Sequence, residues 1–225
     1  MGSNTEPEAR RSFAEGVGGL SGDDLPDGSR DTAHYVRDYL ATLAALLAAV
    51  DTDAVVRATD LLEAAYQNGG RLVLCGNGGS GATASHLACD FLKAIRLEVP
   101  GNRPFEVIAL SDSPALLSAW GNDAGFAEVF AGPARTWLRE GDVLLALSAS
   151  GNSPNVLRAV AVARQIGATS IGLCGYGGGA LAAAVDLPLV TSRRNMQQVE
   201  DLHLAIGHLL FSALRDRIQG RIDHQ

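Results

Sequence analysis

The segment from Leu72 to Asp90, LVLCGNGGSGATASHLACD, constrains the fold more than any other stretch of the chain. Its continuous apolar run, Leu72–Cys75, predicts a strand that is covered on both faces. A glycine-rich turn follows at Gly76–Gly79, and we expect a helix that opens at Ser80. Such a turn leaves backbone N–H groups free at a helix N-terminus, where the helix dipole favours an anion. The segment therefore predicts a strand–turn–helix unit with an anion site, although a tight turn without a ligand stays an alternative.

The same order of strand, turn and helix repeats along the chain. It predicts an α/β fold, a doubly wound parallel five-stranded sheet between layers of helices, with two helices before the first strand. The expected strands are Leu72–Cys75, Glu106–Leu110, Val143–Leu147, Ser170–Cys174 and Leu187–Val190. The expected helices lie near 31–50, 51–68, 80–94, 114–121, 126–138, 154–166, 179–185 and 196–218.

Composition narrows the class of protein. The 225-residue chain has a formal net charge of −7 and no run of Lys or Arg, which argues against a nucleic-acid surface. Three cysteines lie inside apolar runs and lack C-x-x-C spacing, so we expect reduced, buried thiols. Because no apolar run approaches about 20 residues and no signal-peptide pattern is present, we expect a cytoplasmic protein without membrane contact. Residues 1–30 are expected to be a flexible segment and residues 31–225 a single domain.

A second turn, SASGNSP from Ser148 to Pro154, gives a stronger signal than the first. Ser153 is expected at the N-cap of the following helix and Pro154 at its first position. Three hydroxyls and one amide gather there, whereas capping alone requires one serine. Ligands of parallel sheets bind beyond the carboxyl ends of the strands. This turn therefore predicts phosphate binding.

Several segments together resemble the sugar isomerase (SIS) domain family and, within it, the phosphoheptose isomerases. The resemblance rests on S-x-S-G-N-S after an apolar strand, L-C-G-N-G-G-S near the front, G-N-D-x-G-F in the middle and E-D-L-H-x-x-x-x-H at the end. It covers roughly residues 35–218. It implies an aldose–ketose isomerase that converts sedoheptulose 7-phosphate to D-glycero-D-manno-heptose 7-phosphate through an enediol. It also implies a homotetramer with active sites between subunits, and zinc in several members.

The resemblance implies roles for individual residues. Asp90 stands at the position of the catalytic glutamate of the family, and His208 at that of its catalytic histidine. His86 and Glu200 take the two other zinc-ligand positions, so that one Zn²⁺ per subunit would be held by His86, Asp90, Glu200 and His208. Contacts to phosphate and sugar are expected from Asn77, Gly78, Ser80, Asp123, Ser148, Ser150, Asn152, Ser153 and Gln197.

Three positions depart from the family pattern. Asp90 replaces a glutamate, which pulls the carboxylate back by about 1.5 Å. Glu200 replaces a glutamine, and Ala149 replaces a hydroxyl residue. The first two changes give two histidines and two carboxylates, a set suited to Zn²⁺. On a straight helix Glu200 and His208 differ by about 12 Å in rise, so both reach one ion only at full stretch or across a subunit boundary.

The residues themselves leave alternatives open. Glu200 can simply favour a helix N-terminus, and His208 can be a packed core histidine. The chain can also be a non-catalytic SIS module that binds a phosphosugar or a protein partner, or an isomerase of another sugar phosphate. The motifs do not report the length of the pocket, which separates heptoses from shorter sugars.

Overall fold

The computed structural model describes residues 31–99, 101 and 103–222. The predicted flexible segment, 1–30, lies outside the described residues. Contacts divide the chain into residues 1–37 and 38–225, a boundary that falls within α2 (Thr32–Ala48). The fold described below is that of the second unit, and a single domain over 31–225 stays a prediction. Among the described residues no single helix is long and apolar enough to cross a membrane, and only α2 and α3 (Thr52–Asn68) together, bent by 65°, pass by length and composition.

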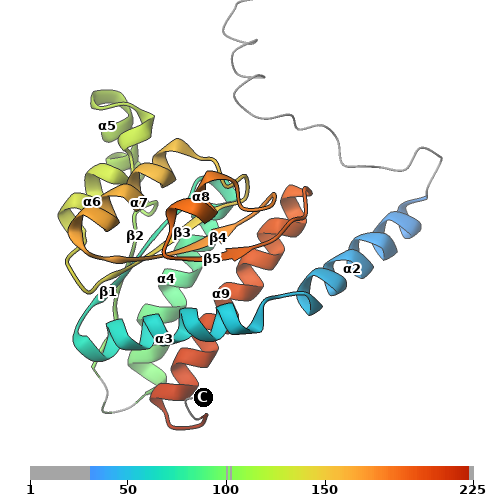
Figure 1. The fold of residues 1–225 in the computed structure, drawn as a ribbon, viewed down its shortest axis with the longest axis horizontal. Coiled ribbons are helices and arrows are strands. Elements are labelled where there is room, and N and C mark those ends of the chain that lie inside the picture. Colours follow the sequence, from blue (N-terminus) through green and yellow to red (C-terminus); the bar gives the residue numbers. More distant parts are fainter. Residues whose placement is uncertain (1–30, 100, 102, 223–225) are drawn as a thin grey trace, which may run out of the picture. The chain divides into compact units, whose positions relative to one another are not determined.

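Five parallel strands form one sheet in the order β2–β1–β3–β4–β5 (Figure 1). The chain passes from β1 outward to β2 and then crosses back to β3 on the other side of β1, so the strand order reverses between β1 and β3. All five predicted strands are confirmed, with bounds that shift by at most one residue. They are β1 (Arg71–Cys75), β2 (Glu106–Ala109), β3 (Val143–Ser148), β4 (Thr169–Cys174) and β5 (Leu187–Val190).

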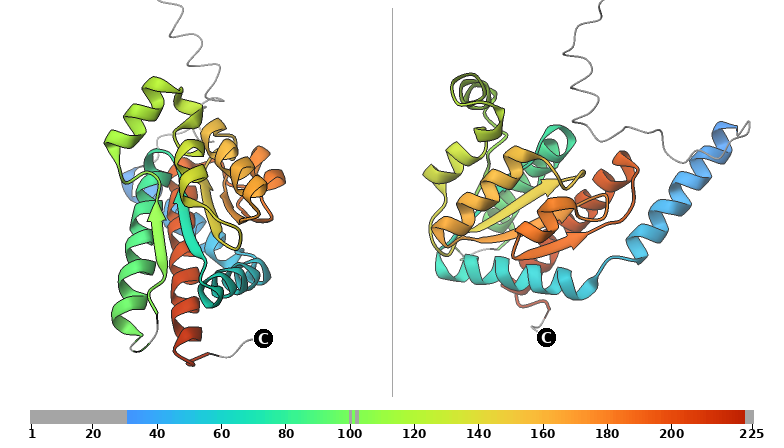
Figure 2. Two further views of the ribbon diagram at one scale, coloured as in Figure 1. Left: turned by 90° about the vertical axis from the view of Figure 1, so that its left-hand side faces the viewer. Right: turned by 45° about the horizontal axis from the view of Figure 1, so that its top comes forward.

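Helices cover both faces of the sheet and build two separate cores, which confirms the predicted doubly wound α/β class. On one face α3, α4 (Gly78–Glu98) and α9 (Met196–Ile218) pack around side chains such as Leu62, Phe91 and Leu210. The other core contains Phe130, Val160 and Leu181. Figures 1 and 2 show the two layers on opposite sides of the strands. The remaining helices are α5 (Pro114–Asp123), the 3₁₀ helix η1 (Phe126–Glu128), α6 (Ala131–Trp137), α7 (Pro154–Ile166) and α8 (Gly179–Ala184).

Two predicted helices need correction. The first begins at Gly78 rather than Ser80, two residues earlier, with Asn77 in extended conformation as its N-cap residue. The single helix expected over 126–138 is divided into η1 and α6. Pro133 is the reason, since proline lacks an N–H donor and its ring would clash with the carbonyl of Val129 in a continuous helix.

The cysteine prediction holds for two residues of three. Cys75 and Cys174 are buried, and burial raises the pKa of each thiol to about 12, so both stay protonated. Cys89 is exposed on α4, contrary to the expectation from its apolar neighbours. It occupies the solvent side of an amphipathic helix, which its immediate neighbours in the sequence do not reveal.

A buried ion pair fastens α9 to α3. Arg217 Nη1 lies 2.5 Å from Asp60 Oδ1 and 3.2 Å from Glu63 Oε2. The side chains of Arg217 and Glu63 are only 6 % and 9 % exposed, so both charges depend on each other rather than on water.

We expect Arg217→Met to lower the free energy of unfolding by about 3 kcal/mol, because it removes the positive charge that faces the buried Glu63 carboxylate. Arg221→Met is the matched control: this side chain is 61 % exposed beside Asp216, and its loss should change stability by less than about 0.5 kcal/mol. Urea unfolding at one fixed protein concentration measures both. Equal stabilities of the two variants would contradict the role given to Arg217.

A second buried titratable group, His203 on α9, is 2 % exposed. Burial lowers the pKa of the His203 imidazole to about 4, and the nearby backbone of Cys174 opposes the shift only in part. Its imidazole is therefore neutral in the folded protein, whereas in the unfolded chain it titrates near its ordinary pKa of about 6.5.

Stability should therefore fall as the pH drops from about 6.5 towards 4, because in that range the unfolded chain binds a proton at residue 203 that the folded protein does not. The slope is at most about 1.4 kcal/mol per pH unit. His203→Gln removes the titration, and unfolding measured between pH 7 and 5 should show a shallower slope for the variant than for the parent. The other histidines are common to both proteins and cancel, so equal slopes would contradict the prediction.

Candidate active site

Three side chains from two helices converge on the outer side of α4 and α9. The Nε2 atoms of His86 and His208 lie 3.0 Å apart, and Asp90 Oδ2 lies 3.3 Å from the first and 3.5 Å from the second. The close approach of the helices permits this, since a Cβ at Gly207 would lie 2.4 Å from Leu87 Cδ1. We call His86, Asp90 and His208 the ligand group.

The ligand group has the dimensions of a tetrahedral zinc site. With bonds of about 2.0–2.1 Å, two ligand atoms on a tetrahedral Zn²⁺ lie about 3.3 Å apart. The three separations, 3.0, 3.3 and 3.5 Å, bracket that value. Two imidazoles and one carboxylate leave a fourth position open, which is the arrangement of catalytic rather than structural zinc.

The ligand group is accessible. The side chains of His86, Asp90 and His208 are 51 %, 30 % and 45 % exposed, so solvent or a ligand can reach all three. This exposure excludes the alternative that His208 is a packed core histidine. The distances of 3.3 and 3.5 Å show that the carboxylate of Asp90, although one methylene shorter than glutamate, still reaches both imidazoles.

Glu200 occupies a different place. Among the described residues, its carboxylate is not part of the ligand group but lies over the first turn of α4, where a Cβ at Gly79 would come within 2.3 Å of Glu200 Oε1. Burial raises the pKa of the Glu200 carboxyl, and the charge of Asp201 adds to the rise. The positive end of the α4 dipole is a favourable place for a carboxylate. The structure thus brings together three of the four predicted metal ligands, and Glu200 as the fourth stays a prediction.

The turn between β3 and α7 gathers the predicted serine hydroxyls. Ser148 Oγ lies 3.1 Å from Ser153 Oγ and 3.4 Å from Ser150 Oγ. Ser153 is the N-cap residue of α7, as predicted, yet its side chain makes no capping hydrogen bond. A cluster of hydroxyls beside the free N–H groups of a 13-residue helix is a favourable anion site. We call Ser148, Ser150 and Ser153 the hydroxyl cluster.

Two neighbours shape this turn. Gly151 has φ +67°, and a Cβ there would lie 2.3 Å from the carbonyl oxygen of Gly178, so only glycine fits without a backbone shift. Asn152 donates to the Ser150 carbonyl at 3.0 Å and accepts from Ala180 N–H at 3.0 Å. The amide of Asn152 is therefore occupied in holding the turn against the start of α8.

The other predicted contact residues have distinct surroundings. Ser80 is 6 % exposed within the first turn of α4, and Gly78 in the same turn has φ +52°. Asp123 is exposed at the end of α5 and accepts a hydrogen bond from Asn122 at 2.8 Å. Gln197 is exposed at the start of α9. The ligand group does not include Ser80, Gly78, Asp123 or Gln197. The contacts of these four residues to a sugar stay predictions.

The side chain of Asn77 forms hydrogen bonds with that of Asn155, a residue that no sequence motif indicated. Asn155 follows the serine turn, in SGNSPN, at the second position of α7, and it is 2 % exposed. Its proximity to the first glycine turn depends on the order of β1 and β3 in the sheet, which no local pattern contains.

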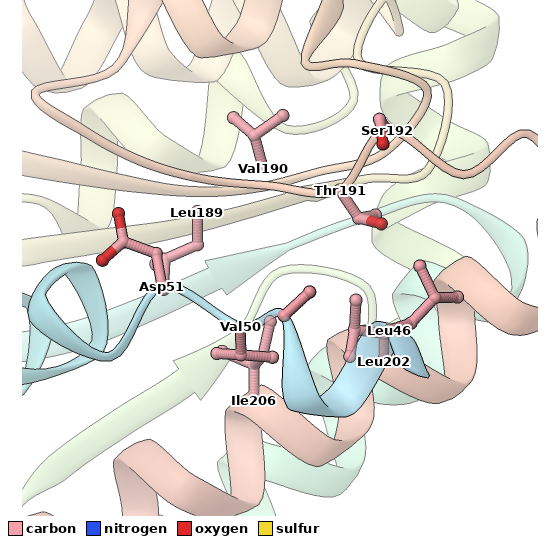
Figure 3. Close-up of a pocket in the computed structure, with 10 residues that line it drawn as sticks. Leu46, Val50, Asp51, Leu189, Val190, Thr191, Ser192, Leu202 and Ile206 are labelled. Carbon is pink, nitrogen blue, oxygen red and sulfur yellow. The ribbon is translucent and has the colours of Figure 1, made fainter. Parts of the chain in front are cut away.

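A separate pocket lies at the edge strand (Figure 3). Leu189 of β5, Leu202 and Ile206 of α9, and Leu46 and Val50 near the α2–α3 corner contribute to its lining. This lining is mainly apolar and contains none of the site residues predicted from the sequence. The pocket is therefore distinct from the candidate active site.

Comparison with known proteins agrees with this architecture. Residues 34–175 match the family model of the SIS domain. The phosphoheptose isomerase of Chlorobaculum parvum is 40 % identical over 174 residues, which are 76 % of this chain and 82 % of that protein. The phosphoheptose isomerase of Trichlorobacter lovleyi is 36 % identical over 188 residues, 84 % and 94 % of the two chains.

Solved structures give the same result. The structure of a phosphoheptose isomerase from Francisella tularensis superposes with a TM-score of 0.75 at 28 % identity and covers 84 % of this chain and all of the other. The resemblance predicted from the motifs is thereby confirmed. The chain belongs to the SIS domain family and, within it, to the phosphoheptose isomerases, which are phosphosugar isomerases.

Proposed function

We propose that the protein converts sedoheptulose 7-phosphate to D-glycero-D-manno-heptose 7-phosphate. The observation that carries the proposal is the presence of two complementary parts in one subunit, the hydroxyl cluster and the ligand group. A regulatory module that only binds a phosphosugar requires the first part alone. The ligand group, with separations suited to a metal ion, therefore favours an isomerase over a binding module.

The reaction moves hydrogen between adjacent carbons. A base removes a proton from C1 while an acid protonates the C2 carbonyl oxygen, which gives a 1,2-enediol. Loss of the O1 hydroxyl proton and return of a proton to C2 then give the aldose. We assign the base to Asp90 and the acid to His208, whose Nδ1–H would be the proton donor when Nε2 holds a metal ion. The hydroxyl cluster holds the phosphate, so that the reacting carbons are presented in one orientation.

We propose that the ligand group holds one Zn²⁺ per subunit. When bound, zinc supplies Lewis-acid polarisation of the substrate oxygens. Asp90 Oδ2 faces both histidines, which leaves Oδ1 for proton transfer. Glu200 as a fourth ligand requires that its carboxylate leave the first turn of α4.

The homotetramer with active sites between subunits and the cytoplasmic location belong to the same proposal. The exposure of the ligand group supports a site that a second subunit completes. Leu40 and Leu47 on α2 support association too, because these large apolar side chains are 58 % and 42 % exposed. The proposed partner is a small sugar phosphate, without nucleic acid or membrane.

We expect the purified protein to contain about one zinc per chain and to interconvert the two heptose phosphates. Asp90→Asn and His208→Ala should each lower kcat at least about a hundredfold, because the first removes the base and the second the acid. Elemental analysis and a coupled assay of aldose formation measure the two properties. A panel of shorter ketose phosphates tests the choice of substrate.

Glu98→Gln is the matched control for this experiment. It removes a carboxylate from the same helix, 52 % exposed beside Arg215, and should leave activity and zinc content unchanged. The mass of the assembly in solution confirms that the variants stay folded. Full activity in Asp90→Asn or His208→Ala would overturn the catalytic assignment.

A second prediction concerns the phosphate. Ser153→Ala should raise KM about tenfold with little change in kcat, because it removes a hydrogen bond to a charged group that is present throughout the reaction. Since Ser153 makes no capping hydrogen bond, α7 should not be weakened. Ser118→Ala in α5 removes an exposed hydroxyl that donates to Ala115 O within the same helix and serves as the control. An unchanged KM in Ser153→Ala would contradict the phosphate assignment.

A further inference from the structure

Two asparagines join the turns that follow β1 and β3. Asn77 Nδ2 donates to Asn155 Oδ1, and Asn155 Nδ2 donates back to Asn77 Oδ1, each at 2.8 Å. Two reciprocal bonds between planar amides set the distance between the groups and also their relative rotation. Asn77 is the N-cap residue of α4 but makes no side-chain capping hydrogen bond. Its amide is therefore engaged with Asn155 and not in capping its own helix.

The Asn77–Asn155 pair lies where the two layers of the fold meet. β1 and β3 are neighbours at the reversal of strand order, where α/β proteins bind ligands. The helix after β1, α4, packs in the core with α3 and α9, whereas the helix after β3, α7, packs in the other core. Because the two helices pack in different cores, a polar contact between their N-termini links one layer to the other. The amide pair supplies that link.

The two turns differ in what they can bind. The Glu200 carboxylate lies over Gly79, so the turn before α4 disfavours a second anion. The turn before α7 presents the uncharged hydroxyl cluster. A sugar phosphate that bridges the turns would place its phosphate on the hydroxyl cluster and its hydroxyls near Asn77–Ser80. Its binding then depends on the separation of the two turns.

We propose that Asn77 and Asn155 are positioning residues, which hold the two turns at the separation and rotation that a bridging sugar phosphate requires. The proposal deepens the proposed function and rests on it for the identity of the ligand. It assigns the side chain of Asn77 to Asn155, and leaves the backbone N–H groups of the turn to face the sugar.

The test compares one ligand that spans both turns with one that touches a single turn. In Asn155→Ala the apparent Kd for sedoheptulose 7-phosphate, measured by calorimetry on the full-length protein as purified, should rise at least about tenfold, since a shift of about 1 Å misplaces the sugar. The Kd for inorganic phosphate should change less than about twofold. The kcat/KM for sedoheptulose 7-phosphate should fall as its Kd rises.

Gln67→Ala is the control, because it removes an amide that also bonds within the protein, to Glu63 in α3, and should change neither Kd. If Asn155→Ala weakens both ligands equally, the pair has only a general structural role, and the proposal is overturned. If it weakens neither, the proposal is overturned as well. Absence of turnover in the parent protein would contradict the proposed function, whereas the two Kd values would still decide the role of the pair.

Discussion

The contact between α4 and α9 is the interaction on which the candidate site depends. The ligand group is divided between these helices, two residues on one and one on the other, so its internal distances are set by how closely the helices pack. Gly207 permits the close approach to Leu87, and the buried Arg217 fastens the far end of α9 to α3. The 3.0–3.5 Å separations are thus a product of helix packing and not of either helix alone.

At the carboxyl edge of the sheet, the turns before α4 and α7 differ in the charge of the side chains beside them. Both turns there place free N–H groups at a helix N-terminus, and both would attract an anion if they were alike. The two turns differ because the Glu200 carboxylate already lies at the positive end of the α4 helix dipole. The serine hydroxyls of the other turn carry no charge, so the positive end of the α7 helix dipole can still attract an anion. Glu200 would therefore direct the proposed phosphate ligand to the neighbouring helix, α7.

Local patterns predicted the strands well, because a parallel strand buried on both faces needs a continuous apolar run. The motifs also predicted the ligand group, since His86 and Asp90 are one helical turn apart and His208 followed from the family resemblance. The pairing of Asn77 with Asn155 could not be predicted from local patterns. The two residues are 78 positions apart, and they meet only because β1 and β3 are neighbours in the sheet. The rotamer of Glu200 was equally hidden, because a flexible side chain chooses between a helix terminus and a more distant ion. Pro133 marks the break before α6 in the sequence, but the prediction placed one continuous helix across it.

The existence of two cores has a consequence for how such a chain can change. Substitutions at distant sites without shared partners add in their effects, whereas neighbours in one core must change together. The layer that carries the ligand group and the layer that follows the hydroxyl cluster pack around different side chains. One layer can therefore accumulate replacements around the hydroxyl cluster while the other keeps its geometry. The sheet thus separates two layers whose apolar cores can vary separately, while the Asn77–Asn155 pair still joins the two turns.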